Sequence, residues 1–269
     1  MIEELAKAVR ERKVILFVGS GVSKNLGLPL FSELVQHLAV ELNYDPEIFA
    51  THGDYLALAE YYQLVKGTIG PLRSWMDRTW HTGVDLSKSE IHKLIVELDF
   101  PIIYTTNYDT WLEQSYALQK RDYVKIANGG DLIKVKPGVA QIIKFHGDTE
   151  DDASIVLTES SYFSRLDFES PLDIKLRSDL LGKSVLFIGC SLSDINIRYM
   201  LYKLNLQWKS SSYTSARPNS FIFLARPNPV QEKVLSSRGI QAIVSDADNP
   251  EIGLRKFLKH LLREGLGRA

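Results

Sequence analysis

The 269-residue chain carries 32 lysine and arginine residues against 33 aspartate and glutamate residues, which gives a formal net charge of −1. This balance supplies no basic field that would hold nucleic acid, so we expect no direct nucleic-acid partner. The sequence lacks an apolar run of the roughly 18 residues that suggest a membrane span, and its start lacks a signal-peptide pattern. We therefore expect a cytoplasmic protein without a membrane segment.

Short apolar runs alternate along the chain with longer amphipathic stretches. The apolar runs predict strands at Val14–Val18, Ile102–Tyr104, Ile142–Phe145, Val185–Ile188, Phe221–Leu224 and Ala242–Val244. The amphipathic stretches predict helices at Ile2–Arg12, Pro29–Leu42, Tyr55–Lys66, Lys88–Leu98, Pro171–Leu181, Asn196–Leu206, Pro229–Ser237 and Glu251–Arg263. This alternation is typical of an α/β fold, and we predict a Rossmann-like, mostly parallel sheet with helices on both faces.

One long section between the first two predicted strands departs from this alternation. Residues 43–99 show helical periodicity and no convincing strand. We interpret about 43–100 as a helical insertion on the sheet, inside a single domain that spans 1–269.

A single cysteine, Cys190, limits the metal chemistry that the chain can support. One cysteine forms neither an intramolecular disulfide nor a cysteine-cluster zinc site. Five of the six histidines stand outside any motif, and we predict structural roles for them. We expect a protein that binds no metal.

The first predicted strand runs into a glycine turn, Gly19-Ser20-Gly21-Val22-Ser23, and then into a helix. Glycines in such a turn let the main chain approach a pyrophosphate. The isolated G-x-G is a weak signal, because Lys24 stands where the dinucleotide fingerprint has its third glycine. A tight turn without a ligand remains the alternative at this point.

Three later predicted strands also end in polar or glycine-containing segments. These segments are Thr105-Thr106-Asn107-Tyr108-Asp109, His146-Gly147 and Gly189-Cys190-Ser191-Leu192-Ser193-Asp194. Open α/β sheets bind their ligands at the carboxyl ends of the strands. We therefore expect the four segments to meet at one edge of the sheet.

Together with Gly27-Leu28-Pro29-Leu30-Phe31, these segments resemble the motifs of the sirtuin family, in family order, over Gly19–Asp194. The resemblance implies NAD as the bound substrate. It implies NAD-binding roles for Gly19, Ser20, Gly21, Ser23, Pro29, Phe31, Thr105, Asp109, Gly189 and Ser191. It also implies that Asn107 and His146 are the catalytic residues.

The resemblance assigns a role to each polar side chain. Asn107 would orient the nicotinamide ribose and the attacking water, and Asp109 would help to hold the nicotinamide carboxamide. His146 would act as a general base, since an imidazole accepts a proton near neutral pH. The structural alternatives are that Asn107 or Asp109 caps the following helix, and that His146 is an ordinary buried histidine.

The chain also departs from deacylase sirtuins, which carry four zinc-binding cysteines and an arginine where Ser32 stands. These departures, and the segment Ile155-Val156-Leu157-Thr158 followed by Tyr162, resemble a bacterial branch of sirtuin-like NAD hydrolases of anti-phage defence. The expected reaction is hydrolysis of NAD to nicotinamide and ADP-ribose. An NAD-dependent protein deacylase and a non-catalytic NAD or ADP-ribose sensor are the alternatives.

An NAD hydrolase that is always active would poison its own cell, so we expect its activity to be controlled. The fold and the insertion take up nearly all of the 269 residues, which leaves assembly as the expected means of control. The expected partner is a second copy of the chain or a defence protein of the ATPase or short Argonaute type. We expect the contacts on the helical insertion and on Glu251–Arg263.

Overall fold

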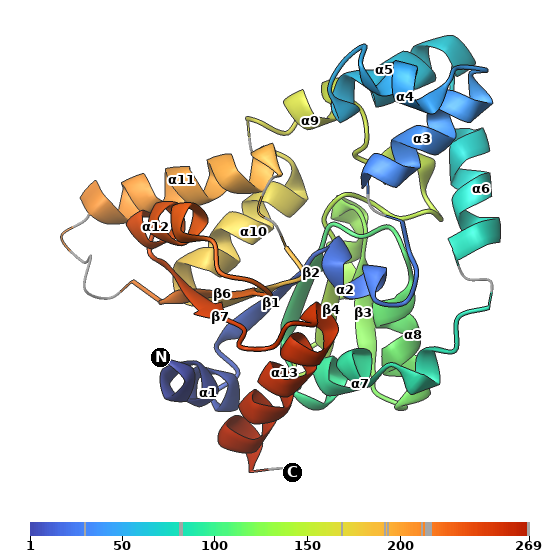
Figure 1. The fold of residues 1–269 in the computed structure, drawn as a ribbon. Coiled ribbons are helices and arrows are strands. Elements are labelled where there is room, and N and C mark those ends of the chain that lie inside the picture. The colour runs from blue at the N-terminus through green and yellow to red at the C-terminus, as the bar shows by residue number, and fades with distance from the viewer. Residues whose placement is uncertain are drawn as a thin grey trace.

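A seven-stranded sheet forms the centre of the computed structural model (Figure 1). The structure describes 1–29, 31–80, 83–167, 169–190, 192, 194–210, 212 and 217–267, with nothing on the side chains of 31 and 32. The strands are β1 (Val14–Val18), β2 (Ile102–Thr105), β3 (Tyr123–Ile126), β4 (Ala140–Lys144), β5 (Ser184–Ile188), β6 (Ser220–Leu224) and β7 (Ile240–Val244). They are ordered β3-β4-β2-β1-β5-β6-β7, and each neighbouring pair in that sheet is parallel.

The six strands predicted from apolar runs are confirmed, with ends that shift by at most two residues. Strand β3 was not predicted, and its sequence explains why. It lies at the edge of the sheet and pairs with β4 alone in the part of the chain that the structure describes. Its first three residues are only half-buried, so they do not form the apolar run by which central parallel strands are recognised.

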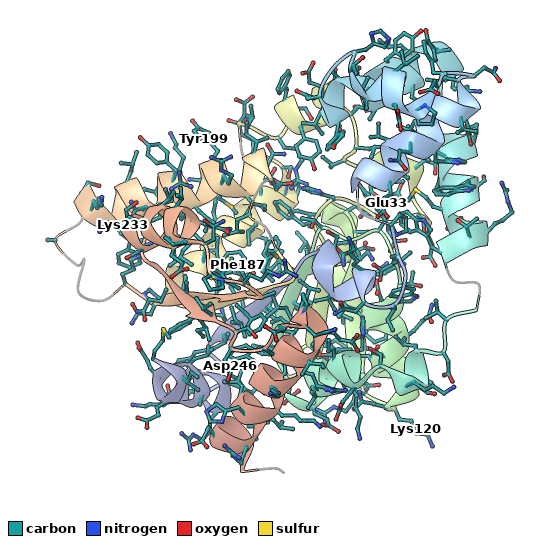
Figure 2. The ribbon with its side chains drawn as sticks, viewed as in Figure 1. Glu33, Lys120, Phe187, Tyr199, Lys233 and Asp246 are labelled. Carbon is teal, nitrogen blue, oxygen red and sulfur yellow. The ribbon has the colours of Figure 1, made fainter. Side chains whose placement is uncertain are left out.

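Helices cover both faces of the sheet, and each face has its own core. One layer consists of α1 (Ile2–Arg10), α7 (Glu90–Glu97), α8 (Trp111–Leu118) and α13 (Pro250–Leu266). The other layer consists of α10 (Pro171–Gly182), α11 (Ile195–Ser210) and α12 (Pro229–Ser237). Alternate residues of β1 enter the two cores, Leu16 on one face and Phe17 on the other. Phe187 of β5 is buried in the second core, whereas Tyr199 is exposed on α11 (Figure 2).

A group of helices stands beyond the sheet and carries a third core. It consists of α3 (Phe31–Glu41), α4 (Pro46–Ala50), α5 (Tyr55–Lys66) and α6 (Gly70–Trp80), coloured blue to cyan in Figure 1. Asp45 and Asp54 each accept two main-chain N–H bonds at the start of a helix, α4 and α5 respectively. Tyr108 and Leu157, from loops near the carboxyl edge of the sheet, complete the apolar cluster of the group.

This helical group begins before residue 43 and ends at Trp80. Helix α7, which the sequence analysis included in the insertion, packs against α13 in a core of the sheet. The remaining described helices are short: α2 (Ser20–Lys24) and α9 (Glu159–Phe163) follow strand-end loops. The helices predicted from periodicity are all present, and the largest shift is at α11, which ends at Ser210 instead of Leu206.

Candidate active site

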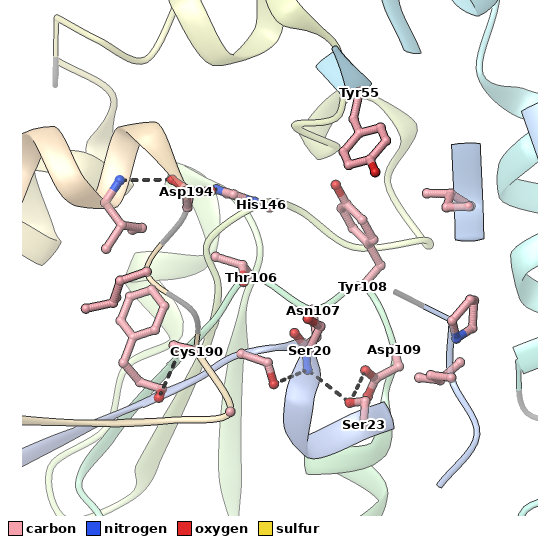
Figure 3. A pocket seen from close by; sticks show the side chains of 18 of the residues that line it. Ser20, Ser23, Tyr55, Thr106, Asn107, Tyr108, Asp109, His146, Cys190 and Asp194 are labelled. Atoms are coloured by element: carbon pink, nitrogen blue, oxygen red, sulfur yellow. Dashed lines mark hydrogen bonds and ion pairs between the residues drawn. The ribbon is translucent and has the colours of Figure 1, made fainter. Parts of the chain in front are cut away.

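A cavity of about 650 Å³ opens at the carboxyl ends of β1, β2, β4 and β5. The loops that follow these four strands form most of its wall (Figure 3). The helical group adds Leu34, Tyr55 and Trp80 to the wall, and helix α9 adds Tyr162. Segments distant in sequence thus meet at the edge where parallel α/β sheets bind ligands.

Most of the predicted site residues line this cavity. They are Gly19, Ser20, Ser23, Pro29, Asn107, Asp109, His146 and Gly189. Gly21 and Thr105 are not among the residues that line it. Ser191 and the side chain of Phe31 lie outside the described residues, so their predicted contacts with NAD stay predictions.

The glycines of the first turn allow two loops to touch. A Cβ on Gly19 would lie 2.5 Å from the main-chain oxygen of Gly189, and a Cβ on Gly21 would lie 2.9 Å from the same oxygen. The Gly21 N–H donates to that oxygen at 2.9 Å. Gly189 has a φ of +62°, a conformation that favours glycine. The G-x-G pattern is therefore explained first by packing of the β1 loop against the β5 loop.

A directed chain of hydrogen bonds fixes Asn107. Its Nδ2 donates to the Gly19 main-chain oxygen at 3.2 Å and to Ser23 Oγ at 2.9 Å. Ser23 in turn donates its hydroxyl proton to Asp109 Oδ2 at 2.7 Å. The Gly19 oxygen can only accept a hydrogen bond, and the Ser23 hydroxyl already donates its one proton to Asp109. Both groups therefore need a donor from Asn107, which determines the orientation of its amide.

This orientation leaves one polar atom of Asn107 without a partner. Its Oδ1 is buried and forms no hydrogen bond with any described residue. Buried polar atoms are almost always paired, so an unpaired one on a cavity wall indicates a ligand-binding position. Thr105 supports the loop from behind, since its hydroxyl donates to Val18 O at 2.9 Å and accepts the Asn107 N–H at 3.0 Å.

Asp109 also caps the start of α8, which is the structural alternative given for it in the sequence analysis. Its Oδ1 accepts the first main-chain N–H of α8, from Trp111, at 3.0 Å. Behind it, the fully buried Lys144 donates from Nζ to the Asp109 main-chain oxygen and lies 3.5 Å from Glu113 Oε1. Burial raises the pKa of Glu113. The loop that carries Asn107 is thus held from both sides.

His146 is buried at the end of the β4 loop. Its Nε2 lies 3.3 Å from Oδ2 of the neighbouring Asp194 (Figure 3), and its Nδ1 lies 3.4 Å from the Tyr162 hydroxyl. Burial lowers the pKa of His146 from 6.5 to about 4, although the nearby Asp194 carboxylate acts in the opposite direction. The ring is therefore neutral at pH 7, which is the form that accepts a proton.

The glycine after His146 is required by a close approach of the chain. Gly147 has a φ of +91°, and a Cβ there would overlap the main-chain oxygen of Ser154. The main chain folds back at this point, since the Val156 N–H donates to His146 O at 2.8 Å. The His-Gly pair is thus a turn that places the imidazole on the cavity wall.

Sequence reasoning missed three aromatic or acidic groups of this wall. Asp194 lies inside one of the recognised motifs, and the sequence analysis assigns it no role. An aspartate just before an amphipathic stretch is a known signal for the N-terminus of a helix. Tyr55 and Trp80 come from the helical group, and no local pattern distinguishes them from core residues. Their position depends on how that group packs on the sheet.

The single cysteine of the chain also lies at this site. Cys190 is half-buried on the cavity wall, with Sγ 3.3 Å from Ile188 O, and burial raises the pKa of its thiol, so the reactive thiolate is disfavoured. Among the described residues, no three histidine, cysteine, aspartate or glutamate side chains are grouped so that they could hold a metal ion. Within the same part of the chain, no helix is long and apolar enough to span a membrane.

Comparison with known proteins gives a family and several relatives. The model of the SIR2-like domain family matches residues 101–243, which is more than half of the chain. NAD(+) hydrolase ThsA of Acinetobacter baumannii (strain 532279) is 28% identical over 212 residues, covering 78% of this chain and 43% of that protein. NAD(+) hydrolase ThsA of Enterococcus faecium is 30% identical over 206 residues, covering 75% and 42%.

A further relative has a different name and is longer still. Defense-associated sirtuin 2 of Bacillus subtilis is 24% identical over 253 residues, covering 90% of this chain and 24% of that protein. The chain thus spans less than half the length of each of these three relatives. The match of the family model confirms the resemblance that the four strand-end motifs predicted: the chain belongs to the SIR2-like domain family.

Proposed function

We propose that this chain hydrolyses NAD to nicotinamide and ADP-ribose. The observation that carries the proposal is that one cavity wall holds both the unpaired Asn107 Oδ1 and the neutral imidazole of His146. A pure binding module has no need of a buried neutral base beside a fixed acceptor. The names of two relatives, both NAD(+) hydrolases, support the same reaction.

The residues of the wall fit the chemistry of this bond cleavage. Departure of nicotinamide builds positive charge on the ribose, as in glycoside hydrolysis. Asn107 Oδ1 is a preorganised acceptor that would orient the ribose and stabilise this charge. His146 would take a proton from the attacking water, and Asp109, fixed by Ser23 and by the Trp111 N–H, would help to hold the carboxamide.

The test is to incubate the purified protein with NAD and separate the products, with and without an acylated peptide. Hydrolysis predicts nicotinamide and ADP-ribose in equal amounts, whether or not the peptide is present. Nicotinamide release that requires the peptide would support the deacylase alternative. Tight NAD binding without any product would support the sensor alternative.

Two substitutions test the assignment of the catalytic residues. Asn107→Ala and His146→Ala should each lower nicotinamide release by about 10²–10⁴-fold, the usual effect of losing a general acid–base group or a fixed polar group. The matched control is His260→Ala, on α13 and away from the cavity. If His146→Ala hydrolyses NAD at the normal rate, the assignment is wrong.

We also propose that the physiological role is NAD depletion in bacterial anti-phage defence, controlled by assembly. The name of the Bacillus subtilis relative supports a defence role. The partner would be a second copy of the chain or a defence ATPase or short Argonaute. The outer faces of α3, α4 and α5 support the contact, because they expose the apolar side chains Val40, Ile48, Leu64 and Val65.

A further inference from the structure

The carboxylate of Asp194 is fixed next to His146 by hydrogen bonds from two elements, α11 and α9. Its Oδ1 accepts the main-chain N–H of Ile197, at the start of α11, at 2.9 Å. Its Oδ2 accepts the Tyr162 hydroxyl at 3.2 Å and lies 3.3 Å from His146 Nε2. Asp194 also lines the cavity (Figure 3). The carboxylate is therefore held beside the imidazole, and both side chains line the cavity.

His146 needs such a neighbour if it is to accept a proton. Burial disfavours the charged imidazolium, and the Arg165 guanidinium, which lies over the adjacent Phe145 ring, disfavours it further. Two carboxylates act in the opposite direction, those of Asp194 and Asp173, and Asp194 has the larger effect. Tyr162 faces the same ring and stays protonated, because burial raises the pKa of its phenol.

Tyr162 connects the two partners. Its hydroxyl has one proton, which it donates to Asp194, and its ring packs edge-on against His146 with centroids 5.2 Å apart. The Tyr162 oxygen then has a lone pair directed to His146 Nδ1 at 3.4 Å. An Nδ1–H tautomer would place the free lone pair on Nε2, the nitrogen beside Asp194.

We infer that Asp194 is a positioning residue for the proposed hydrolysis, which orients His146 and stabilises the imidazolium that forms during the reaction. Water attacks the ribose carbon, the carbon–nitrogen bond breaks, and its electron pair leaves with neutral nicotinamide. The proton of the water moves to His146 and then to solvent. The inference rests on the proposed function, and it adds a carboxylate to the pair Asn107 and His146.

The experiment is a double-mutant cycle between Asp194 and His146. Asp194→Asn keeps the size of the side chain and its helix-capping oxygen but removes the charge. We expect it to lower kcat by 10- to 100-fold and to change KM by less than threefold. In the His146→Ala background the same substitution should cause no further loss, because groups that act through one another are not additive. The matched control is Asp45→Asn, a helix-capping aspartate outside the cavity.

Several results would overturn the inference. An equal loss of kcat in both backgrounds would mean that Asp194 acts without His146, and a wild-type rate for Asp194→Asn would mean that it does not act. If Asp194→Asn does not fold, Asp194→Ser, which retains a capping hydroxyl, is read in the same way.

A readout without turnover separates this inference from the proposed function. Side-chain NMR of ¹⁵N-labelled histidines gives the pKa of His146 directly, and Asp194→Asn should lower it. If the wild-type protein releases no nicotinamide, the proposed function fails. The titration still tests whether Asp194 stabilises the protonated form of His146. An unchanged pKa of His146 in Asp194→Asn would overturn the inference.

Discussion

At the scale of single residues, the site depends on atoms that are fixed before any ligand arrives. The Asn107 amide can take only one orientation, because Gly19 O and Ser23 Oγ both accept hydrogen bonds from its Nδ2. The His146 ring contacts Tyr162 at Nδ1, whereas its buried Nε2 lies 3.3 Å from Asp194 Oδ2 and forms no hydrogen bond with any described residue. Preorganised polar groups of this kind cost no reorganisation at the moment of reaction.

A first residue-scale prediction concerns Gly147. Gly147→Ala should lower the free energy of unfolding through backbone strain of about 1–3 kcal/mol and through a clash with Ser154 O. The matched control is Gly138→Ala, at a φ of +78° with no atom within 4 Å of the added Cβ, which tests strain alone. Urea unfolding of both variants measures the difference. Equal losses at the two positions would show that the clash with Ser154 is relieved.

A second residue-scale prediction concerns acid stability. Burial lowers the pKa values of His92 and His146 to about 4 in the folded protein, below the value near 6.5 of an unfolded chain. Between pH 6.5 and 4 the unfolded chain therefore binds protons that the folded protein does not. The free energy of unfolding should fall as pH falls through this window, by up to about 1.4 kcal/mol per pH unit for each group.

The measurement is urea unfolding at a series of pH values, for the wild type and for His92→Gln. The variant should show a shallower fall between pH 6.5 and 4, because one of the two buried histidines no longer contributes. His92 lies on α7, outside the cavity, so the comparison leaves the site intact. A slope as steep as that of the wild type would contradict the prediction.

At the scale of elements, the sequence predicted those strands and helices that a local hydrophobic pattern marks. Strands β1 and β5, fully or almost fully buried, appear as continuous apolar runs, and the motif loops follow their carboxyl ends. The edge strand β3 has no such run, because its first three residues are only partly buried. Asn107, His146 and Gly189 could be assigned to one sheet edge from these runs alone. The cavity wall from Tyr55 and Trp80 could not, since it depends on packing between distant helices.

An element-scale prediction concerns the buried pair that joins β4 to α8. Lys144→Met should destabilise the protein by about 3–5 kcal/mol, because it leaves the buried Glu113 carboxylate without a cation. The double variant Lys144→Met/Glu113→Leu should recover part of this loss, since no unpaired charge remains. Chemical denaturation measures both. A double variant less stable than Lys144→Met would show that the Lys144 bond to Asp109 O is the dominant contribution.

At the scale of the whole molecule, a sheet with both faces covered leaves its carboxyl edge as the place for a ligand, and the helical group of α3 to α6 closes that edge. The sequence contains one cysteine, too few for a cysteine-cluster zinc site. We expect chelators to change neither the melting temperature nor NAD cleavage. Stoichiometric zinc in elemental analysis of the purified protein would contradict this and favour the deacylase alternative.

The last prediction joins the helical group to control of activity. The same helices that line the cavity expose apolar side chains on their outer faces, among them Leu64, which is 73% exposed. A contact on those faces would act directly on the cavity wall and could raise the fraction of molecules competent to bind NAD. Leu64→Asp should therefore weaken assembly and lower turnover together, whereas Ile133→Asp, at an even more exposed apolar residue outside this group, should change neither. Light scattering and NAD turnover, measured over a range of protein concentrations with and without a co-expressed neighbour, give both quantities. A wild-type monomer that hydrolyses NAD at full rate alone, and gains nothing from any neighbour, would exclude control by assembly.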